Sequence, residues 1–243
     1  DGLGVFNWDN PYVRGMYDRG YPANRIGVSR TTDPNNVPEG GPQVIATDES
    51  ETLDGLAFTV TDAQTGTTAR FETAVVGQHN VTNILIATAV ALYEGMTLDE
   101  IAARVRTLQP AEARLVRNVL PNGMTIINDA YSANPVGAVS SLRVLGMHDT
   151  GRRLLITPGM VELGDLHHEE NRKLGQQAAN YATDIILVGE EQTAPIRDGL
   201  NDTDFAKDRV MVMETVTEAI AWYQANLGAG DTVLFLNDLP DTY

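Results

Sequence analysis

Five short apolar runs, separated by segments with helical periodicity, constrain the fold of this chain more than any other feature. The runs cover 124–128, 153–157, 184–188, 210–213 and 232–236, and the helical patterns between them cover about 136–147, 167–181, 192–200 and 215–227. Continuous apolar strands that alternate with helices are typical of a parallel sheet covered on both faces. The sequence therefore predicts an α/β fold, with an open and mainly parallel sheet flanked by helices over residues 111–243.

The first part of the chain has a different texture, rich in residues that form turns. Several clusters of Asn, Asp, Gly and Pro before residue 43 mark loops. Segments 56–60 and 69–75 flank a polar stretch and are predicted to pair as a hairpin. Apolar patterns over 80–94 and 98–108 predict two helices, the second opened by a Thr97–Glu100 capping box. The change of texture near Pro110 predicts two domains, 1–110 and 111–243.

Composition excludes several classes of function. The chain has 17 basic and 33 acidic side chains, a formal charge of −16, so nucleic acid is not expected as a partner. The absence of cysteine excludes disulfides, a thiolate zinc site and a cysteine nucleophile. No apolar run approaches the roughly 18 residues of a membrane span, and the N-terminus does not resemble a signal peptide. We expect a cytoplasmic protein and, since the chain starts at Asp1 without an initiator Met, a fragment or processed product.

Asp129 stands where a predicted strand ends and the chain turns toward a helix. In open α/β sheets, ligands bind beyond the carboxyl ends of the strands, which directs attention to 128–131, 157–159 and 236–238. The Asp129 carboxylate could accept two hydrogen bonds from a ribose diol. It could equally cap the following helix or hold Asn134 in a turn. Both interpretations stay open on the sequence alone.

The segment GQHNVTN, residues 77–83, places polar side chains at the start of an otherwise apolar helix. Asn80 and Asn83 are three residues apart and share one face of the first turn. An Asn carboxamide carries both a donor and an acceptor, which suits the amino and ring-nitrogen edge of adenine. The alternative is that Asn80 only caps the helix.

The segment TPGMVELGDLHHE, residues 157–169, follows a predicted strand and leads into a helix. Its glycines are predicted to shape a substrate-binding loop. His167 and His168 are adjacent, so a helix cannot aim both at one ion, and we predict no metal site. The chain contains no Gly-Lys pair, and therefore no Walker A loop to hold a triphosphate.

Five stretches, taken in order, resemble motifs of the Mur ligase family, and most closely its MurF type, the D-alanyl-D-alanine-adding ligases. They are VFNWD at 5–9 for a strand and Asn-x-Asp turn, 77–83 for G-x-H-N-x-x-N, EARL at 112–115 for G-R-L, DAYSANP at 129–135 for D-x-Y-N-x-N-P, and PGMVELG at 158–164 for G-x-M-x-E-L-G. The resemblance implies an ATP-dependent ligase of peptidoglycan precursor synthesis, which joins an amine to a UDP-muramoyl-peptide through an acyl phosphate.

The family has a UDP-sugar-binding domain, a central ATPase domain and a C-terminal Rossmann-like domain. By resemblance, residues 1–110 would be the back part of the central domain and 111–243 the C-terminal domain. The P-loop, the catalytic residues and the Mg²⁺ ligands would lie upstream of Asp1. We therefore expect the 243-residue chain alone to be inactive. We also expect the intact protein to be a monomer.

The resemblance also assigns roles to single residues. Asn80, Asn83 and His79 would border the adenine of ATP, and Asp129 would bind its ribose hydroxyls. Arg114 would approach the nucleotide, with Tyr131 along the same edge. The loop that contains Gly159, Glu162 and Gly164 would face the incoming amino acid or dipeptide.

Two alternatives to D-alanyl-D-alanine addition remain. The MurF type has Lys-Gly-Ser-Arg after its last strands, whereas residues 236–243 contain no basic side chain to meet a carboxylate terminus. The chain could instead belong to a ligase that acts on a folylpolyglutamate, cyanophycin or lipid-linked muramyl substrate. It could also be a non-catalytic binding module that keeps the Rossmann-like fold.

Overall fold

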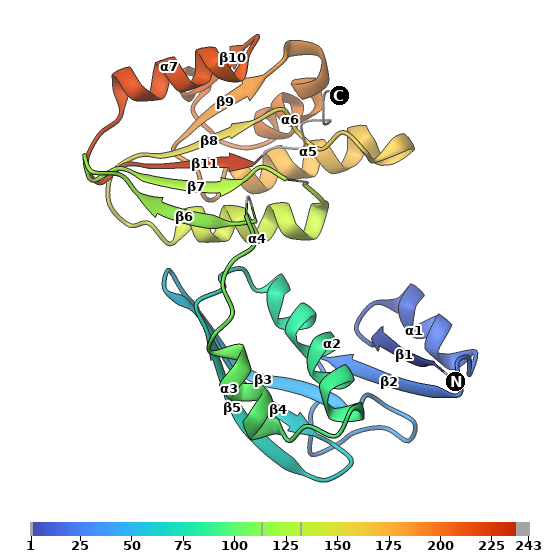
Figure 1. Ribbon diagram of the computed structural model, residues 1–243. Helices are drawn as coiled ribbons and strands as arrows, with labels where there is room; N and C mark the ends of the chain where they lie inside the picture. Colours follow the sequence, from blue (N-terminus) through green and yellow to red (C-terminus); the bar gives the residue numbers. More distant parts are fainter. Residues whose placement is uncertain (1, 113, 132, 237–243) are drawn as a thin grey trace. The chain divides into compact units, whose positions relative to one another are not determined.

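The computed structural model describes residues 2–112, 114–131 and 133–236, and the chain divides into two compact units, residues 1–109 and 110–243. The first unit contains β1 (Leu3–Asn7), α1 (Pro11–Asp18), β2 (Asn24–Ser29), β3 (Val44–Thr52), β4 (Gly55–Asp62), β5 (Thr67–Thr73), α2 (His79–Tyr93) and α3 (Leu98–Val105) (Figure 1). The second contains β6 (Val116–Val119), β7 (Thr125–Asp129), α4 (Pro135–Gly146), β8 (Arg153–Thr157), η1 (Gly164–Leu166), α5 (His167–Ala178), β9 (Asp184–Val188), α6 (Glu190–Asn201), η2 (Lys207–Arg209), β10 (Val210–Met213), α7 (Val216–Asn226) and β11 (Thr232–Leu236).

The first unit is built on a five-stranded mixed sheet, sheet A, in the order β1-β2-β3-β4-β5. The first three strands are parallel, and β3, β4 and β5 form an antiparallel meander that includes the predicted hairpin. The core between sheet A and helices α2 and α3 contains the fully buried Phe58, Phe71 and Leu85. The predicted capping box at Thr97 and Glu100 is present at the start of α3.

The turn-rich region before residue 55 holds more regular structure than its composition indicates. It contains α1 and three strands, β1, β2 and β3. The second half of β3 carries Asp48, Glu49 and Glu51, residue types that are uncommon in strands. A bulge between Thr47 and Ser50, with Asp48 at a φ of 50°, lets β3 stay paired with β4.

The second unit contains a six-stranded sheet, sheet B, in the order β10-β9-β8-β11-β7-β6. All its pairs are parallel except β6 with β7, so the predicted open and mainly parallel sheet is confirmed. Helix α7 packs on one face, where Leu154, Ile156 and Ile186 are buried. The alternate residues Leu155 and Ile185 are also fully buried, and the alternation of side chains along a strand directs them to the opposite face of the sheet. Helices α4, α5 and α6 cover that face (Figure 1).

Helices α5 and α6 pack against each other through two glycines. A Cβ atom added at Gly199 of α6 would overlap the backbone carbonyl oxygen of Arg172 in α5. In the same way, a Cβ added at Gly175 of α5 would overlap the carbonyl oxygen of Ile196 in α6. The two backbones therefore approach more closely than any other residue type allows.

Among the described residues, no helix is both long enough and apolar enough to traverse a bilayer.

His148, just after α4, gives the second unit a buried titratable group. Its side chain is 8% exposed, and its Nε2 has no hydrogen-bond partner among the described residues. Burial lowers the pKa of His148 below its ordinary 6.5, and the nearby charge of Arg117 lowers it further, as does Arg153, while Asp149 opposes them. A lowered pKa means that the unfolded chain binds a proton more readily than the folded chain.

We expect this histidine to make stability fall on mild acidification. Well above pH 6.5 the imidazole is neutral in both states, and as the pH falls through 6.5 the unfolded state gains the proton first. His148→Leu should therefore flatten the dependence of the free energy of unfolding on pH between 7 and 5. The difference between variant and parent at pH 8 gives the packing effect and serves as baseline. A wild-type pH slope in the variant would contradict this assignment.

Candidate functional site

Most of the predicted site residues lie at or just after the carboxyl ends of the parallel strands in sheet B. Asp129 is the last residue of β7, and the 159–164 loop follows the end of β8. Phe235 of β11 is in register with Asn128 on one side and Ile156 on the other, so these strand ends are level. Two strand spacings of roughly 4.8 Å separate β7 from β8.

Asp129 is 9% exposed and accepts hydrogen bonds from two distant segments. Its Oδ1 accepts from the backbone N–H of Leu115 at 3.1 Å, and its Oδ2 accepts from the hydroxyl of Ser141. Leu115 has a φ of 54°, so this carboxylate fixes an unusual backbone conformation where the chain enters the second unit.

The capping alternative for Asp129 is wrong. Helix α4 is capped by Asn134, whose Oδ1 accepts from the N–H of Gly137. Asp129 instead links β7 to the entering segment and to α4.

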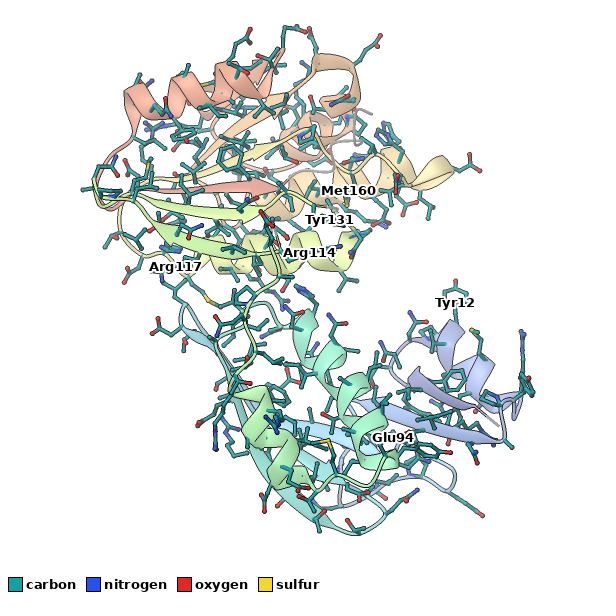
Figure 2. All side chains as sticks on the ribbon, in the orientation of Figure 1. Tyr12, Glu94, Arg114, Arg117, Tyr131 and Met160 are labelled. Atoms are coloured by element: carbon teal, nitrogen blue, oxygen red, sulfur yellow. The ribbon has the colours of Figure 1, made fainter. Side chains whose placement is uncertain are left out.

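Arg114 and Tyr131 form a stacked pair beside Asp129 (Figure 2). The guanidinium carbon of Arg114 lies 4.3 Å from the centre of the Tyr131 ring. Tyr131 is 65% exposed, and a cation over an exposed ring is worth about 0.5 to 1 kcal/mol. Because Arg114 precedes Leu115 and Tyr131 follows Asp129 by two residues, all three predicted residues form one group.

The loop after β8 begins on a buried path and then reaches the surface. Gly159 has a φ of 87° and lies against α5, and Met160 is 1% exposed. Glu162 is exposed, and Gly164 opens η1 with a φ of 51°. Both glycines thus occupy conformations that favour glycine.

The start of α2 holds the other three predicted residues. Gly77 has a φ of 92°, and its N–H donates to Oε1 of Glu51 in β3 at 2.6 Å. Asn80 donates to the carbonyl oxygen of Val76 at 2.8 Å and accepts from Asn83 at 3.0 Å. The two carboxamides therefore share one face of the first turn, as predicted.

The capping alternative for Asn80 is also wrong. The N-cap of α2 is Gln78, which makes no side-chain capping bond, and Asn80 uses its Nδ2 on a carbonyl. His79 is the first residue of the helix and is half-buried. That Asn80, Asn83 and Asp129 contact one nucleotide, as the resemblance implies, remains a prediction.

Sequence reasoning missed three residues that hold these groups in place: Glu51, Ser141 and Asn171. The burial of Asn171 could have been predicted, because it lies on the same helix face as Leu174, Gly175 and Ala178, at the spacing i, i+3, i+4 and i+7. Residues 237–243, where the MurF-type basic cluster is missing, lie outside the described residues.

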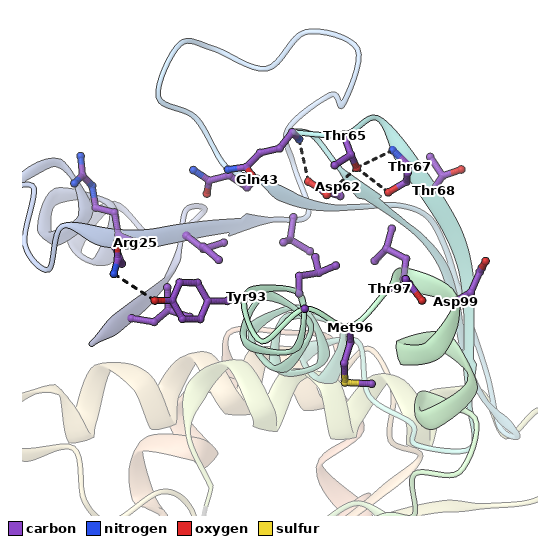
Figure 3. Close-up of a pocket in the computed structure, with 18 of the residues that line it drawn as sticks. Arg25, Gln43, Asp62, Thr65, Thr67, Thr68, Tyr93, Met96, Thr97 and Asp99 are labelled. Atoms are coloured by element: carbon purple, nitrogen blue, oxygen red, sulfur yellow. Dashed lines mark hydrogen bonds between the residues drawn. The ribbon is translucent and has the colours of Figure 1, made fainter. Parts of the chain in front are cut away.

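A pocket of about 870 Å³ lies at the end of sheet A that is away from the start of α2 (Figure 3). It is lined by the amino ends of β2 and β3, by the β4–β5 turn, and by Tyr93 at the carboxyl end of α2. A helix of 15 residues spans roughly 22 Å, so this pocket is far from the start of α2. Polar side chains that line it hydrogen-bond to one another, as in the pairs Asn24–Tyr93 and Asp62–Thr65.

Across the described ranges, no group of three or more His, Asp or Glu side chains is arranged to hold a metal ion.

Comparisons with known proteins identify the family. The family described as Mur ligase, glutamate ligase domain, matches residues 113–237. The UDP-N-acetylmuramoyl-tripeptide–D-alanyl-D-alanine ligase of Bacillus subtilis is 28% identical over 189 residues, which cover 77% of this chain and 40% of that protein. The enzyme of the same name from Mycobacterium leprae is 28% identical over 255 residues, or 96% of this chain and 48% of that protein.

Solved structures agree in fold. MurF from Acinetobacter baumannii matches 98% of this chain and 49% of its own with a TM-score of 0.77 at 22% identity. MurF from Thermotoga maritima, solved in complex with ADP, matches 98% of this chain and 50% of its own with a TM-score of 0.75 at 16% identity. The chain spans about half the length of these relatives. Since the family match covers more than half of the sequence, the chain belongs to the Mur ligase family.

Proposed function

We propose that these residues are part of an ATP-dependent amide ligase of peptidoglycan precursor synthesis. It would join D-alanyl-D-alanine, or a related amine, to a UDP-muramoyl-peptide. The observation that carries this proposal is the group formed by Asp129, Arg114 and Tyr131 at the carboxyl edge of sheet B. A buried carboxylate beside an exposed aromatic ring and a guanidinium suits a nucleotide, with its ribose diol, planar base and phosphates.

Residues 1–110 are proposed as the back part of the central ATP-binding domain and 111–243 as the C-terminal domain of such a ligase. The match of 98% of this chain, including both sheets, to 49% of MurF from Acinetobacter baumannii supports this division. The P-loop, the catalytic residues and the Mg²⁺ ligands would then be supplied by sequence outside these residues.

The residues at the start of α2 fit the base of a nucleotide. Asn80 uses one donor and one acceptor within the chain, whereas the exposed Asn83 makes one bond through Nδ2 and offers its Oδ1 to a ligand. ATP would supply the phosphoryl group that activates the substrate carboxylate. The chain's own residues would hold the nucleoside, and the 159–164 loop would face the incoming amine.

Asn83→Ala is expected to raise the KM for ATP about 3- to 10-fold. It removes one neutral hydrogen bond, from the base to Oδ1 of Asn83, worth about 0.5 to 1.5 kcal/mol. Val90→Ala is the matched control, because Val90 is 43% exposed and lies two turns further along the same face of α2. This truncation should leave the KM for ATP unchanged.

Asn83 is preferable to Asp129 as a probe, because Asp129 also supports the fold through Leu115 and Ser141. An unchanged KM in Asn83→Ala would refute the adenine contact. An equal rise in Asn83→Ala and Val90→Ala would show a general effect on the helix instead.

The reaction itself is tested with the longest encoded chain that contains these residues. Phosphate release from ATP should require both UDP-muramoyl-tripeptide and D-alanyl-D-alanine, and mass spectrometry should detect the amide product. Turnover with a folylpolyglutamate, cyanophycin or lipid-linked muramyl acceptor instead would assign the chain to another ligase of the superfamily. Nucleotide binding without turnover on any of these substrates would favour the non-catalytic module.

A further inference from the structure

Asn171 of α5 is fully buried and pairs with the loop after β8 at two points. Its Oδ1 accepts from the backbone N–H of Met160 at 2.9 Å, and its Nδ2 donates to the carbonyl oxygen of Met160 at 2.8 Å. The second hydrogen of Nδ2 donates to the carbonyl oxygen of His167 at 3.0 Å. The carboxamide thus satisfies both backbone groups of Met160, as a neighbouring strand would.

The preceding residue fits around the same side chain. A Cβ atom added at Gly159 would lie 2.7 Å from Oδ1 of Asn171, so only glycine leaves room for this amide. The N–H of Gly159 donates to Oγ1 of Thr157 at 3.0 Å. The N–H groups of Gly159 and Met160 are therefore both engaged within the protein and are not the donors that a substrate would meet.

These contacts define where the loop leaves the interior. Up to Met160, which is 1% exposed, the path is fixed by buried hydrogen bonds, and two residues later Glu162 is exposed. The direction in which Glu162 and its neighbours emerge then depends on the Asn171–Met160 pair. Because α5 also packs against α6 through Gly175 and Gly199, the helix that carries Asn171 is itself held in place.

We propose that Asn171 is a positioning residue, which orients the 161–164 segment toward the amine substrate without touching that substrate. This inference rests on the proposed function, which assigns the loop to the incoming amine. The chemistry requires a neutral group that donates and accepts at once. A carboxylate at this position would face two carbonyl oxygens and have no donor for either.

The test uses Asn171→Asp in the longest encoded chain. At pH 8 the KM for the amine should rise at least tenfold, while the KM for ATP should change less than twofold. Hydrogen exchange in a peptide covering 158–163 should be at least tenfold faster, because the carboxylate cannot donate to the carbonyl oxygens of Met160 and His167, is repelled by them, and no longer holds the loop against α5. Asn180→Ala is the control, since Asn180 is exposed and its side chain donates to the carbonyl oxygen of Gln176 at 3.3 Å, a long surface bond.

Acid should rescue the variant. Burial against two carbonyl oxygens raises the pKa of the introduced carboxyl group, and its protonated form can donate to Met160 while accepting from it. The ratio of the amine KM in Asn171→Asp to that of the parent should therefore fall between pH 8.5 and pH 6. A purely structural lesion would not recover in this way. If Asn171→Asp does not fold, Asn171→Ser is measured instead, with the same exchange and KM criteria.

Faster exchange together with a selective rise in the amine KM supports the inference. Unchanged exchange at 158–163, or an equal rise in both KM values, overturns it. If the parent protein forms no amide with any amine, the proposed function fails and the substrate named here fails with it. The exchange result still decides whether Asn171 fixes the loop, so the two failures are distinguishable.

Discussion

Replacing Gly199 by valine should lower the free energy of unfolding of the second unit by about 3 kcal/mol or more. The added Cβ atom would overlap the carbonyl oxygen of Arg172, a backbone atom that cannot move without shifting α5. The change would also displace Gly175, which makes the reciprocal approach to α6. Even Gly199→Ala should destabilise, although alanine is the better helix former by about 1 kcal/mol.

Gly15→Ala is the control, because it should change the free energy of unfolding in the opposite direction from Gly199→Ala. Gly15 lies in the interior of α1, and an added Cβ there meets nothing within 4 Å. Gly15→Ala should therefore stabilise the first unit by up to about 1 kcal/mol, through propensity alone.

Each unit has its own reporter, since the two tryptophans are Trp8 and Trp222. Urea unfolding followed by fluorescence in a Trp8→Phe background reads the second unit. If alanine at position 199 stabilised this unit as it does an isolated helix, the close α5–α6 packing would be wrong.

Asp184→Ala should cost the second unit about 3 kcal/mol. The Asp184 side chain is 1% exposed and accepts from Arg152 at 2.5 and 3.0 Å, and from Arg209 at 3.1 Å. Removal of one partner from a buried ion pair costs about 3 to 5 kcal/mol, because the remaining charge is left unpaired. The side chains of Arg152 and Arg209 are 32% and 50% exposed, which places the effect at the lower end.

The same residue predicts a dependence on acid. Burial alone would raise the pKa of Asp184, but hydrogen bonds from Arg152, Thr183 and Arg209 outweigh burial and hold that pKa below 3.8. The contribution of Asp184 to stability is therefore present above pH 3.8 and is lost as the pH falls through its lower folded-state pKa. Urea unfolding at a series of pH values should show this loss in the parent and not in Asp184→Asn.

Asp198 provides the matched control for Asp184. Its side chain is 58% exposed and lies 4.0 Å from His168 in a surface pair. Asp198→Ala should change the free energy of unfolding by less than about 1 kcal/mol. Equal costs at positions 184 and 198 would show that the Arg152–Asp184–Arg209 cluster does not stabilise the second unit.

The sequence predicted the inner strands of sheet B well because they are buried on both faces. The runs at 153–157, 184–188 and 232–236 coincide with β8, β9 and β11, since a strand covered on both sides must be continuously apolar. The run at 210–213 coincides with β10, a partly exposed edge strand whose four residues are nevertheless all apolar. The antiparallel β6 was missed. It is a partly exposed edge strand of four residues, VRNV, and its apolar and polar residues do not alternate regularly enough to predict a strand.

The candidate site was only partly predictable. Asn80 and Asn83 share a face because of local helical geometry, which spacing alone determines. Asp129 accepts hydrogen bonds from Ser141 and Leu115, and Met160 donates one to Asn171. These contacts depend on how α4, α5 and the entering segment pack against the sheet, and no local pattern specifies that packing.

The position of β11 has a consequence for how the second unit is made. This strand comes last among those of sheet B in the chain, yet it pairs with β7 on one side and β8 on the other, near the middle of the sheet (Figure 1). During synthesis, β6–β7 and β8–β9–β10 can form only as two separate ribbons, each with an open edge, until residues 232–236 leave the ribosome. At about 5 to 20 residues per second, β8 waits several seconds for its partner. A nascent chain that stalls before residue 232 therefore presents two unpaired, apolar strand edges to chaperones and to other nascent chains.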